Sequence, residues 1–242
     1  MKTPTRAVLA LAAILALSGC QKSADAAFGQ KVRAYLLEHP EVIEEAVQKL
    51  QEKKVAEAAN LAKAGMVKHR KALEQDPRDF VANPNGKITV VEFFDYRCGY
   101  CKTSAPEILQ IIRENPDVRF VFKEFPIFGG ESTLAAEVSL SPAGKAQGLA
   151  LHKSFMAEKA LDAASIDRHL AALGINPAQA RAAGQSAAVQ KHIADTRELA
   201  QALGIEGTPA FIVGDRMVPG ADMPALRAAI AAAKAGDIKR AS

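Results

Sequence analysis

Cysteine is scarce in this sequence, which has three cysteines and no tryptophan among 242 residues. Cys98 and Cys101 stand three positions apart, and Cys20 lies near the amino terminus. A structural zinc site usually has four ligands, and the chain offers neither a second Cys-x-x-Cys pair nor two histidines at zinc-finger spacing. The cysteine pattern therefore argues against a zinc module.

An excess of charge of one sign is also lacking. The 31 basic and 27 acidic residues leave a formal net charge of +4, and the basic residues are scattered along the chain. We therefore expect no nucleic-acid partner. The methionines form no cluster of the kind that binds copper, and His152, His169 and His192 show no ligand spacing, so we expect surface or structural histidines and no bound metal or cofactor.

The stretch around Cys98 carries the chemistry. Residues 88–94 form an apolar run rich in β-branched and aromatic side chains, typical of a central strand. Residues 103–113 have helical apolar spacing, which places both cysteines on the first turn of a helix. Amide groups and the helix dipole there favour a thiolate, so Cys98 is the predicted nucleophile, facing solvent. Cys101, one turn further, would point inward and resolve the intermediate.

Two motifs resemble the thioredoxin superfamily. Residues 98–102, Cys-Gly-Tyr-Cys-Lys, are followed by Pro106, at the position where the family has a proline that kinks the active-site helix. Residues 207–211, Gly-Thr-Pro-Ala-Phe, look like the family's cis-proline loop. The order of strand, cysteine helix, strand, helical insert and Gly-Thr-Pro strand is similar to periplasmic Dsb-type oxidoreductases over about residues 78–240.

The resemblance implies an α/β thioredoxin fold over residues 78–242, with an inserted helical domain at about residues 129–203, preceded by an amino-terminal helical arm. It also implies a cis peptide bond before Pro209. Substrate chains would then add as a strand beside the Cys98 sulfur. The residues expected to contact them are Gly99, Tyr100, Thr208 and Pro209.

Glu92 is the anomaly of the central strand. A carboxylate between Val91 and Phe93 should be buried, and burial without a partner would raise its pKa. Its position resembles that of the buried acid beneath the active site of thioredoxin-like enzymes, which predicts a proton relay for Cys101. Lys123, in an expected parallel strand at residues 118–125, is a candidate partner. The alternative is a plain buried ion pair without a catalytic part.

Apolar periodicity and Gly or Pro breaks predict the remaining elements. A short edge strand is expected at residues 79–82, and a hairpin with a two-residue turn at residues 210–218. Asp222 would cap a last helix that Gly236 ends. The insert should contain helices at residues 134–140, 143–157, 166–173, 177–185 and 189–203.

The first residues read as an export signal. Residues 7–17 are apolar but too short to span a bilayer, and Leu-Ser-Gly-Cys at residues 17–20 resembles the lipobox of bacterial lipoproteins. This predicts a signal peptide over residues 1–19, a lipid on Cys20 and a tether over residues 20–27. Gln21 favours the outer membrane by resemblance to sorting rules. Cleavage after residues 24–26 is the alternative and would discard Cys20. Both routes lead to an oxidising compartment, where a lone cysteine pair points to redox work.

Residues 28–75 have the pattern of a helical arm with a break at Pro40. Ile43, Val47 and Leu50 make a seam with coiled-coil spacing, which fails at the next seam positions because these are Lys54 and Glu57. We expect the arm to pack against copies of itself or against the main domain, with a solvated spacer as the alternative. The arm resembles the oligomerising segments of suppressor-of-copper-sensitivity C-type proteins, but the interrupted seam leaves trimer and dimer open.

The residues between the cysteines indicate the direction of exchange. Gly99-Tyr100 lacks the histidine of strongly oxidising relatives and, with Thr208, looks more like the isomerases and reductases. The sequence therefore predicts a lipid-anchored enzyme of the bacterial periplasm that isomerises or reduces disulfides of exported proteins and is kept reduced by a membrane electron donor. The alternatives are a disulfide-forming oxidase and, from another class, a chaperone-like or copper(I)-binding lipoprotein.

Overall fold

A computed structural model describes residues 27–236 of the chain. The expected signal peptide, Cys20 and all but the last residue of the tether lie outside the described residues. The chain divides into two compact units, Met1–Glu57 and Ala58–Ser242. No helix in the described range is both long enough and apolar enough to cross a membrane.

The described part of the first unit consists of helices with a break at His39 and Pro40. Residues 27–38 form one helix, which stops at His39, and α2 (Glu41–Lys68) begins after Pro40. The predicted break is confirmed, because a proline fits the start of a helix and not its interior. The seam residues Ile43, Val47 and Leu50 are 49%, 53% and 50% exposed. Among residues 27–236 these three side chains therefore stay about half exposed.

The second unit begins inside α2 and continues with α3 (Arg70–Glu74) after a turn at His69. The single helix predicted to about residue 73 is thus divided. Met66 and Leu73 are almost fully buried and belong to the core of this unit. The end of the predicted arm therefore helps to build the second unit.

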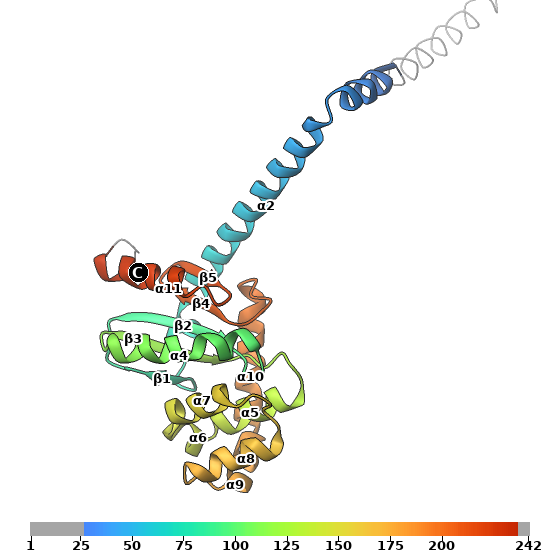
Figure 1. Ribbon diagram of the computed structural model, residues 1–242. Helices are drawn as coiled ribbons and strands as arrows, with labels where there is room; N and C mark the ends of the chain where they lie inside the picture. The colour runs from blue at the N-terminus through green and yellow to red at the C-terminus, as the bar shows by residue number, and fades with distance from the viewer. Residues whose placement is uncertain (1–26, 237–242) are drawn as a thin grey trace, which may run out of the picture. The chain divides into compact units, whose positions relative to one another are not determined.

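A five-stranded sheet with the order β1-β3-β2-β4-β5 forms the centre of the second unit (Figure 1). The strands are β1 (Phe80–Ala82), β2 (Ile88–Phe94), β3 (Val118–Glu124), β4 (Ala210–Val213) and β5 (Arg216–Pro219). β2 and β3 are parallel, as the intervening helix requires, and the other three pairs are antiparallel. The predicted central strand, edge strand and hairpin are confirmed.

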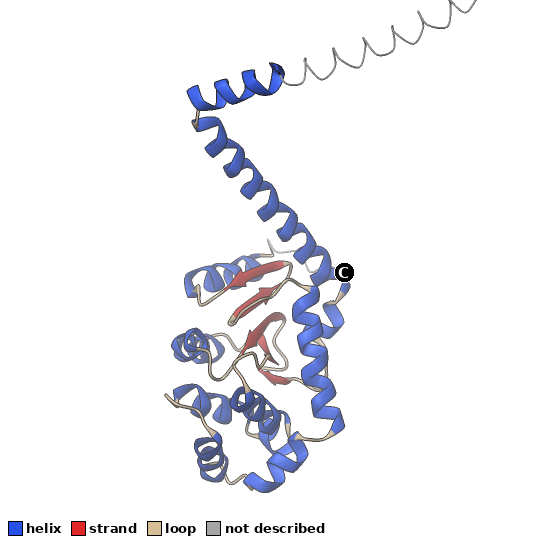
Figure 2. Cartoon of the chain, turned by 90° about the vertical axis from the view of Figure 1, so that its right-hand side faces the viewer, coloured by secondary structure: helices blue, strands red, loops and turns tan. Residues whose placement is uncertain are grey.

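Helices cover both faces of this sheet, as Figure 2 shows. Along β2, Val90 and Phe94 pack with α4 (Gly99–Glu114) and α11 (Met223–Ala235). Val91 and Phe93 pack on the opposite face with α3 and α10 (Ala187–Ala202). Burial on both faces explains why β2 reads as a continuous apolar run.

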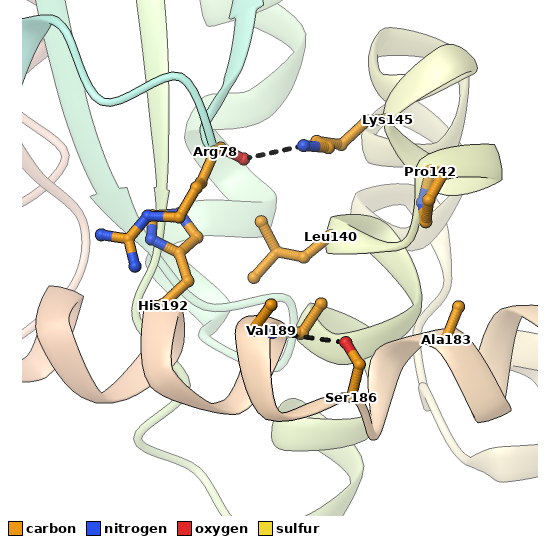
Figure 3. A pocket seen from close by; sticks show the side chains of 9 residues that line it. Arg78, Leu140, Pro142, Lys145, Ala183, Ser186, Val189 and His192 are labelled. Atoms are coloured by element: carbon orange, nitrogen blue, oxygen red, sulfur yellow. Dashed lines mark hydrogen bonds between the residues drawn. The ribbon is translucent and has the colours of Figure 1, made fainter.

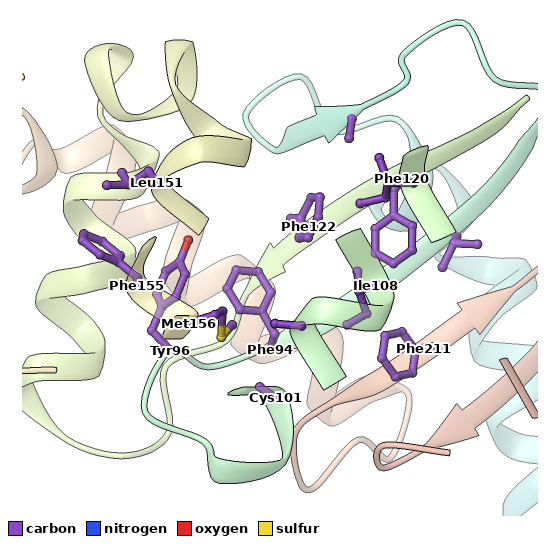
Figure 4. Packing of buried hydrophobic residues seen from close by; sticks show 14 of the residues in the cluster. Phe94, Tyr96, Cys101, Ile108, Phe120, Phe122, Leu151, Phe155, Met156 and Phe211 are labelled. Atoms are coloured by element: carbon purple, nitrogen blue, oxygen red, sulfur yellow. The ribbon is translucent and has the colours of Figure 1, made fainter. Parts of the chain in front are cut away.

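Aromatic rings join the sheet to the helical insert (Figure 4). The Phe94 ring meets Tyr96 edge-on at a centroid distance of 5.0 Å, and Tyr96 meets Phe155 of the insert at 5.1 Å. Each such pair contributes about 0.5–1.5 kcal/mol beyond the area it buries. Cys101 belongs to the same buried cluster. The helix α4, which carries Cys101, is therefore fixed against both the sheet and the insert.

The helical insert between β3 and β4 is confirmed, with three main differences from its predicted helices. α8 begins at Ala163 instead of residue 166. α5 begins at Gly130 instead of residue 134, and the helix predicted at residues 143–157 is divided at Gln147, whose φ of −110° and ψ of 20° leave the helical range. Gly148 lies so close to the Phe80 ring that an added Cβ would come within 2.3 Å of it. The helices are α5 (Gly130–Leu140), α6 (Pro142–Ala146), α7 (Gly148–Ala157), α8 (Ala163–Ala172), α9 (Pro177–Gly184) and α10.

The caps of the last helix follow the prediction. The Asp222 carboxylate accepts a hydrogen bond from the Ala225 amide at 2.9 Å, which begins α11. Gly236 has a φ of 83°, a left-handed conformation that ends the helix. Both predicted boundaries are confirmed.

Candidate active site

Cys98 occupies the N-cap position of α4, with φ −69° and ψ 121°. The Cys101 amide donates a hydrogen bond to the Cys98 Sγ at 3.5 Å, so the sulfur takes the place of a capping oxygen. Both cysteines are free thiols. The predicted arrangement, with Cys98 at the start of the helix and Cys101 in its first turn, is confirmed.

The cis-proline loop lies directly against Cys98. The peptide bond between Thr208 and Pro209 is cis, as the resemblance implied. The Thr208 carbonyl oxygen lies 3.1 Å from the Cys98 Sγ and accepts its hydrogen when the thiol is protonated. With this loop in place Cys98 is only 3% exposed, so the expectation that its side chain faces solvent is wrong. The approach to the sulfur is narrow.

The two cysteines ionise in opposite directions. The neighbouring Cys101 thiol, followed by the Thr208 side chain, outweighs the effect of burial and lowers the pKa of Cys98 to about 5. Burial, followed by the hydrogen bond to Cys98 and the nearby Glu92, raises the pKa of Cys101 far above its ordinary value. At neutral pH the site therefore holds a Cys98 thiolate beside a Cys101 thiol. The thiolate is the form that attacks a disulfide, and the thiol stays protonated until the mixed disulfide is resolved.

Glu92 is the buried acid that the sequence predicts. It is fully buried, and neither carboxyl oxygen has a hydrogen-bond partner among residues 27–236. Burial, followed by the charge of Cys98, raises its pKa to about 8. Because side chains alternate along a strand, Glu92 shares the face of β2 with Val90 and Phe94, the face that α4 covers. Its proton is therefore held beneath the redox helix.

Lys123 is not the partner of Glu92. In the β2–β3 register it stands opposite Phe93, so its side chain leaves the sheet on the other face. There Lys123 is buried and its Nζ binds the Asp79 carboxylate and the Ala72 carbonyl. The predicted pairing is wrong because neighbouring residues of a strand point to opposite sides. The alternative of a buried ion pair at Glu92 fails as well across the described chain.

Asp95, directly after β2, was not predicted as a site residue. Its carboxylate accepts hydrogen bonds from the amides of Arg97, Ile127 and Phe128 at 2.6, 2.7 and 3.1 Å, and from the Ser132 hydroxyl at 2.8 Å. It thus joins the loop before Cys98 to the loop that follows β3 and to α5. The only signal in the sequence was an acid at the end of a buried strand, because three of its donors lie more than thirty residues away.

A second buried hydrogen-bond chain runs beside the pair. The Tyr96 hydroxyl donates to Glu124 at 3.0 Å and accepts from the Ser139 hydroxyl at 3.1 Å. Burial raises the pKa of Glu124 well above its ordinary value. These two hydrogen bonds connect strand β3 to the insert through Tyr96 in the loop before Cys98. The sequence patterns gave no indication of these contacts.

The histidines have structural surroundings. His152 is packed among the rings of Phe94, Tyr96 and Phe122, and burial lowers its pKa to about 3. His192 Nε2 lies 2.9 Å from Asp79, and His169 Nε2 lies 3.1 Å from Glu158. Across residues 27–236, no group of three or more His, Cys, Asp or Glu side chains is placed to hold a metal ion.

A hollow of about 440 Å³ opens where α10 approaches α5 and α6 (Figure 3). Leu140 and Val189 form part of its apolar wall, and Arg78, Lys145 and His192 lie at its edge. Neither cysteine lines it. This hollow is therefore separate from the redox site.

The predicted substrate-contact residues fall into two places. Thr208 and Pro209 belong to the loop beside Cys98, whereas Gly99 and Tyr100 form the first residues of α4. Tyr100 is 72% exposed, and nothing lies within 4 Å of a Cβ added at Gly99. Their role in binding substrate stays a prediction.

A five-stranded sheet, a Cys-x-x-Cys pair at a helix start and a cis-proline loop over the first sulfur define a thioredoxin-fold redox protein. Residues 89–231 match the DSBA-like thioredoxin domain, so this chain belongs to that family. Residues 25–57 match the N-terminal domain of the copper resistance protein ScsC.

Solved structures support this assignment over most of the chain. BcfH from Salmonella enterica Typhimurium is 30% identical with a TM-score of 0.70, covering 90% of this chain and 99% of BcfH. ScsC from Proteus mirabilis in a transitional conformation is 31% identical with a TM-score of 0.64, covering 88% of this chain and 96% of ScsC.

Curated relatives are matched over a smaller share of their length. The thiol:disulfide interchange protein DsbA of Bordetella pertussis is 30% identical over 138 residues, which are 54% of this chain and 65% of DsbA. The Na(+)/H(+) antiporter NhaA 3 of Salinispora tropica is 27% identical over 173 residues, 65% of this chain but only 25% of the antiporter. DsbA-like homologues of this chain are thus thiol–disulfide oxidoreductases.

Proposed function

We propose that this protein is an exported thiol–disulfide oxidoreductase that acts on disulfides of other proteins through Cys98 and Cys101. One observation carries the proposal. Within one helical turn, Cys98 caps α4 beneath the Thr208–Pro209 loop and Cys101 is buried, an arrangement that lowers the pKa of Cys98 to about 5 and raises that of Cys101. A purely structural pair has no need of such a difference.

The chemistry balances as two exchanges. The Cys98 thiolate attacks one sulfur of a substrate disulfide, so that bond breaks, a mixed disulfide forms and the released substrate thiolate takes a proton from water. Cys101 then loses its proton and attacks the Cys98 sulfur, which releases the second substrate thiolate and leaves a Cys98–Cys101 disulfide. The substrate gains two electrons and the pair loses two. If the substrate's own thiolate attacks first, Cys98 leaves and the substrate is only rearranged.

Glu92 is the proposed proton acceptor for Cys101. The thiol must lose a proton inside the protein, and Glu92 is the unpartnered buried carboxyl on the face that α4 covers. With a pKa of about 8, its ionised form is present in a useful fraction near neutral pH and is basic enough to take a proton. Direct transfer and transfer through one water both fit this role.

Gly99-Tyr100 and Thr208 favour isomerisation or reduction, and the acidity of Cys98 supports the isomerisation. At pH 7 a thiol with a pKa of about 5 is ionised about 100 times more than one at its ordinary value of 9. The lower basicity, however, costs about 40- to 100-fold in intrinsic nucleophilicity. Cys98 therefore attacks a disulfide hardly faster than an ordinary thiol would. The low pKa mainly makes Cys98 a better leaving group. A mixed disulfide on Cys98 is then readily displaced by the substrate's own thiol, which is the rearranging step.

The same property suits the alternative, a disulfide-forming oxidase, because a stabilised thiolate favours the reduced form of the pair. The reduction potential decides between them, measured by equilibrating the protein with glutathione buffers. A value near the −120 mV of strong oxidants would establish the oxidase, whereas an intermediate or lower value, toward the roughly −270 mV of thioredoxin, would support the isomerase or reductase.

A variant with Cys101→Ser separates catalysis from binding, the alternative of another class. A catalyst whose resolving thiol is missing should accumulate mixed disulfides through Cys98 when mixed with a scrambled disulfide protein, detected on non-reducing gels. The double variant with Cys98→Ser as well should form none. If the single variant holds its client only non-covalently, or binds copper(I) without exchanging disulfides, the catalytic proposal fails.

We also propose that the arm, residues 28–75, brings copies of the chain together. Its exposed seam of Ile43, Val47 and Leu50 and the match to the ScsC N-terminal domain support this. Self-association would shield Cys98 from oxidising enzymes. Full-length protein should therefore be oligomeric by light scattering, and Val47→Glu with Leu50→Glu should give monomers. Val55→Glu, outside the seam though 68% exposed, is the matched control, and a monomeric parent protein would refute the proposal.

The amino terminus supports a location in the bacterial periplasm with a lipid on Cys20, the outer membrane being favoured. A membrane electron donor would keep the pair reduced. Mass spectrometry of the amino-terminal peptide tests whether Cys20 carries a lipid. In a second experiment, Cys20→Ala should release the protein from membranes. An unmodified parent peptide starting after residue 26 would favour the alternative cleavage.

A further inference from the structure

A hollow of about 280 Å³ lies between the redox helix α4 and helix α7 of the insert. Pro106 and Leu109 of α4 and Met156 of α7 give it an apolar lining. Leu109 and Met156 are almost fully buried, whereas Pro106 is exposed at the rim. The hollow, called here the α4–α7 groove, has room for one apolar side chain of a second molecule.

Basic side chains line the same groove, and no acidic side chain does. Arg113 and Lys153 are exposed, and neither forms an ion pair within residues 27–236. Glu114, next to Arg113 in the sequence, is paired with Arg227 at 3.5 Å. The groove thus has an apolar floor and two cations, and no carboxylate lines it. It therefore complements a ligand that is both apolar and acidic.

Lys102 lies at the end of the groove nearest the cysteines and positions α7 relative to α4. Its Nζ donates to the carbonyl oxygens of Phe155 at 3.3 Å and of Glu158, at the carboxyl end of α7. This contact fixes the separation of the two helices that form the groove. The groove is therefore preformed.

The groove lies in line with the nucleophile along α4, and Lys102, one helical turn beyond Cys98, is the lining residue nearest to Cys98 in the sequence. Cys98, Lys102, Pro106, Leu109 and Arg113 follow one another at intervals of three or four residues, so they lie along one side of α4. At about 1.5 Å per residue, Pro106 is about 12 Å and Arg113 about 22 Å beyond Cys98 along the helix axis. An extended chain rises about 3.3 Å per residue, so about four residues reach Pro106 and about seven reach Arg113.

We infer that the α4–α7 groove binds the segment of a substrate protein next to its reacting cysteine, and that it selects segments with an apolar side chain about four residues from the cysteine and carboxylates about three residues further. The inference rests on the proposed function and adds a substrate class to it. The apolar side chain enters between Pro106 and Met156, and the carboxylates meet Arg113 and Lys153. Binding places the substrate sulfur at Cys98.

The test uses short peptides whose single cysteine carries a thionitrobenzoate leaving group. The Cys98 thiolate attacks the peptide sulfur, the bond to thionitrobenzoate breaks, and the coloured anion is released as the mixed disulfide forms. One peptide has a leucine and two glutamates at the distances given above, and its partner has glutamines in place of the glutamates. Both are made with the cysteine at either end, since the groove does not fix the chain direction.

In one of the two directions, the reduced full-length protein should react about fivefold faster with the acidic peptide at low salt, because each exposed ion pair contributes modestly. Raising the salt should remove most of that preference. Arg113→Glu with Lys153→Glu should reverse it. Lys68→Glu with Lys71→Glu changes the net charge equally on exposed residues of α2 and α3, outside the groove, and should leave it unchanged.

The outcomes separate the inference from the proposed function. Release of thionitrobenzoate from its mixed disulfide with a small uncharged thiol measures the Cys98 chemistry alone and should be the same in both double variants. Equal rates for acidic and neutral peptides with normal release from the small reagent would overturn the groove and leave the oxidoreductase standing. No Cys98-dependent release from any reagent would overturn the proposed function itself.

Discussion

Replacing Glu92 by glutamine removes the titration of a buried carboxyl group that has no hydrogen-bond partner beneath α4, while the shape of the side chain is kept. The substitution should have two opposite effects. It should remove a pH-dependent loss of stability, and it should slow the step in which Cys101 resolves the mixed disulfide. Both follow from the absence of any hydrogen-bond partner for the carboxyl group in the described chain.

The size of the stability effect follows from the pKa. The folded protein keeps the Glu92 proton up to about pH 8, whereas the unfolded chain loses it near the ordinary value of 4.5. Between these values the folded state binds more protons, so the free energy of unfolding falls as the pH rises, by about 1.4 kcal/mol per pH unit. Between pH 5 and pH 7 this one group should cost the parent protein about 2.5 kcal/mol relative to Glu92→Gln.

Urea unfolding of the reduced protein measures this difference. The chain has no tryptophan, so emission from its tyrosines, two of which adjoin the cysteines, reports the transition. The stability gained by Glu92→Gln should grow from pH 5 to pH 7 and level off above about pH 8. Glu206→Gln, at an exposed position, is the control and should show no such trend.

The effect on resolution by Cys101 is measured as the rate at which a peptide thiol is released from a preformed mixed disulfide with Cys98. In the parent protein the rate should rise with pH up to about 8, as Glu92 becomes able to accept a proton, and the variant should be slower and lack that inflection. A variant with the same pH trend in stability as the parent protein would refute the buried, unpartnered acid. A changed trend with an unchanged resolution rate would refute the relay alone.

Three further predictions concern other parts of the molecule. The far-ultraviolet thiolate absorbance of Cys98 should titrate with a pKa of about 5 and vanish in Cys98→Ala; an inflection near the ordinary value would refute the capping geometry. Lys123→Met should lower the free energy of unfolding by about 3–5 kcal/mol, because it leaves Asp79 buried without its cation. Gly148→Ala should cost about 1–3 kcal/mol, because the added methyl group meets the Phe80 ring.

Two matched variants control the stability measurements. Lys159→Met removes an exposed lysine without an ion pair among the described residues and should change stability little. Gly130→Ala adds a methyl group where no atom lies within 4 Å. A loss at either control as large as at Lys123 or Gly148 would show that the contacts named here are not the cause.

Local patterns were enough to predict most of the second unit. The strand of residues 88–94, the hairpin after Pro209 and the cap at Asp222 were predicted correctly because each depends on neighbours in the sequence. The break at Gln147 was missed because apolar spacing continues across it, and the close approach of Gly148 to Phe80 next to it joins residues far apart in the chain. A helical period cannot report such a contact.

The site shows the same division. The position of Cys98 at the helix start could be predicted from spacing, but its burial depends on the Thr208 carbonyl, 110 residues later. Lys123 was assigned to Glu92 on charge alone, whereas the side of the strand on which each residue points decides the pairing. Asp95 escaped notice because its importance lies in the donors that surround it.

The helical insert leaves and rejoins the sheet near the same sulfur. It departs through the loop that Asp95 holds, and the chain returns through the Thr208–Pro209 loop that covers Cys98. The outer surface of the insert can therefore be lengthened or recharged without touching α4 and the Thr208–Pro209 loop, which set the acidity of the thiol. Diversity among relatives should gather in the insert and change which proteins reach Cys98, while the reactivity of the sulfur is inherited with the sheet.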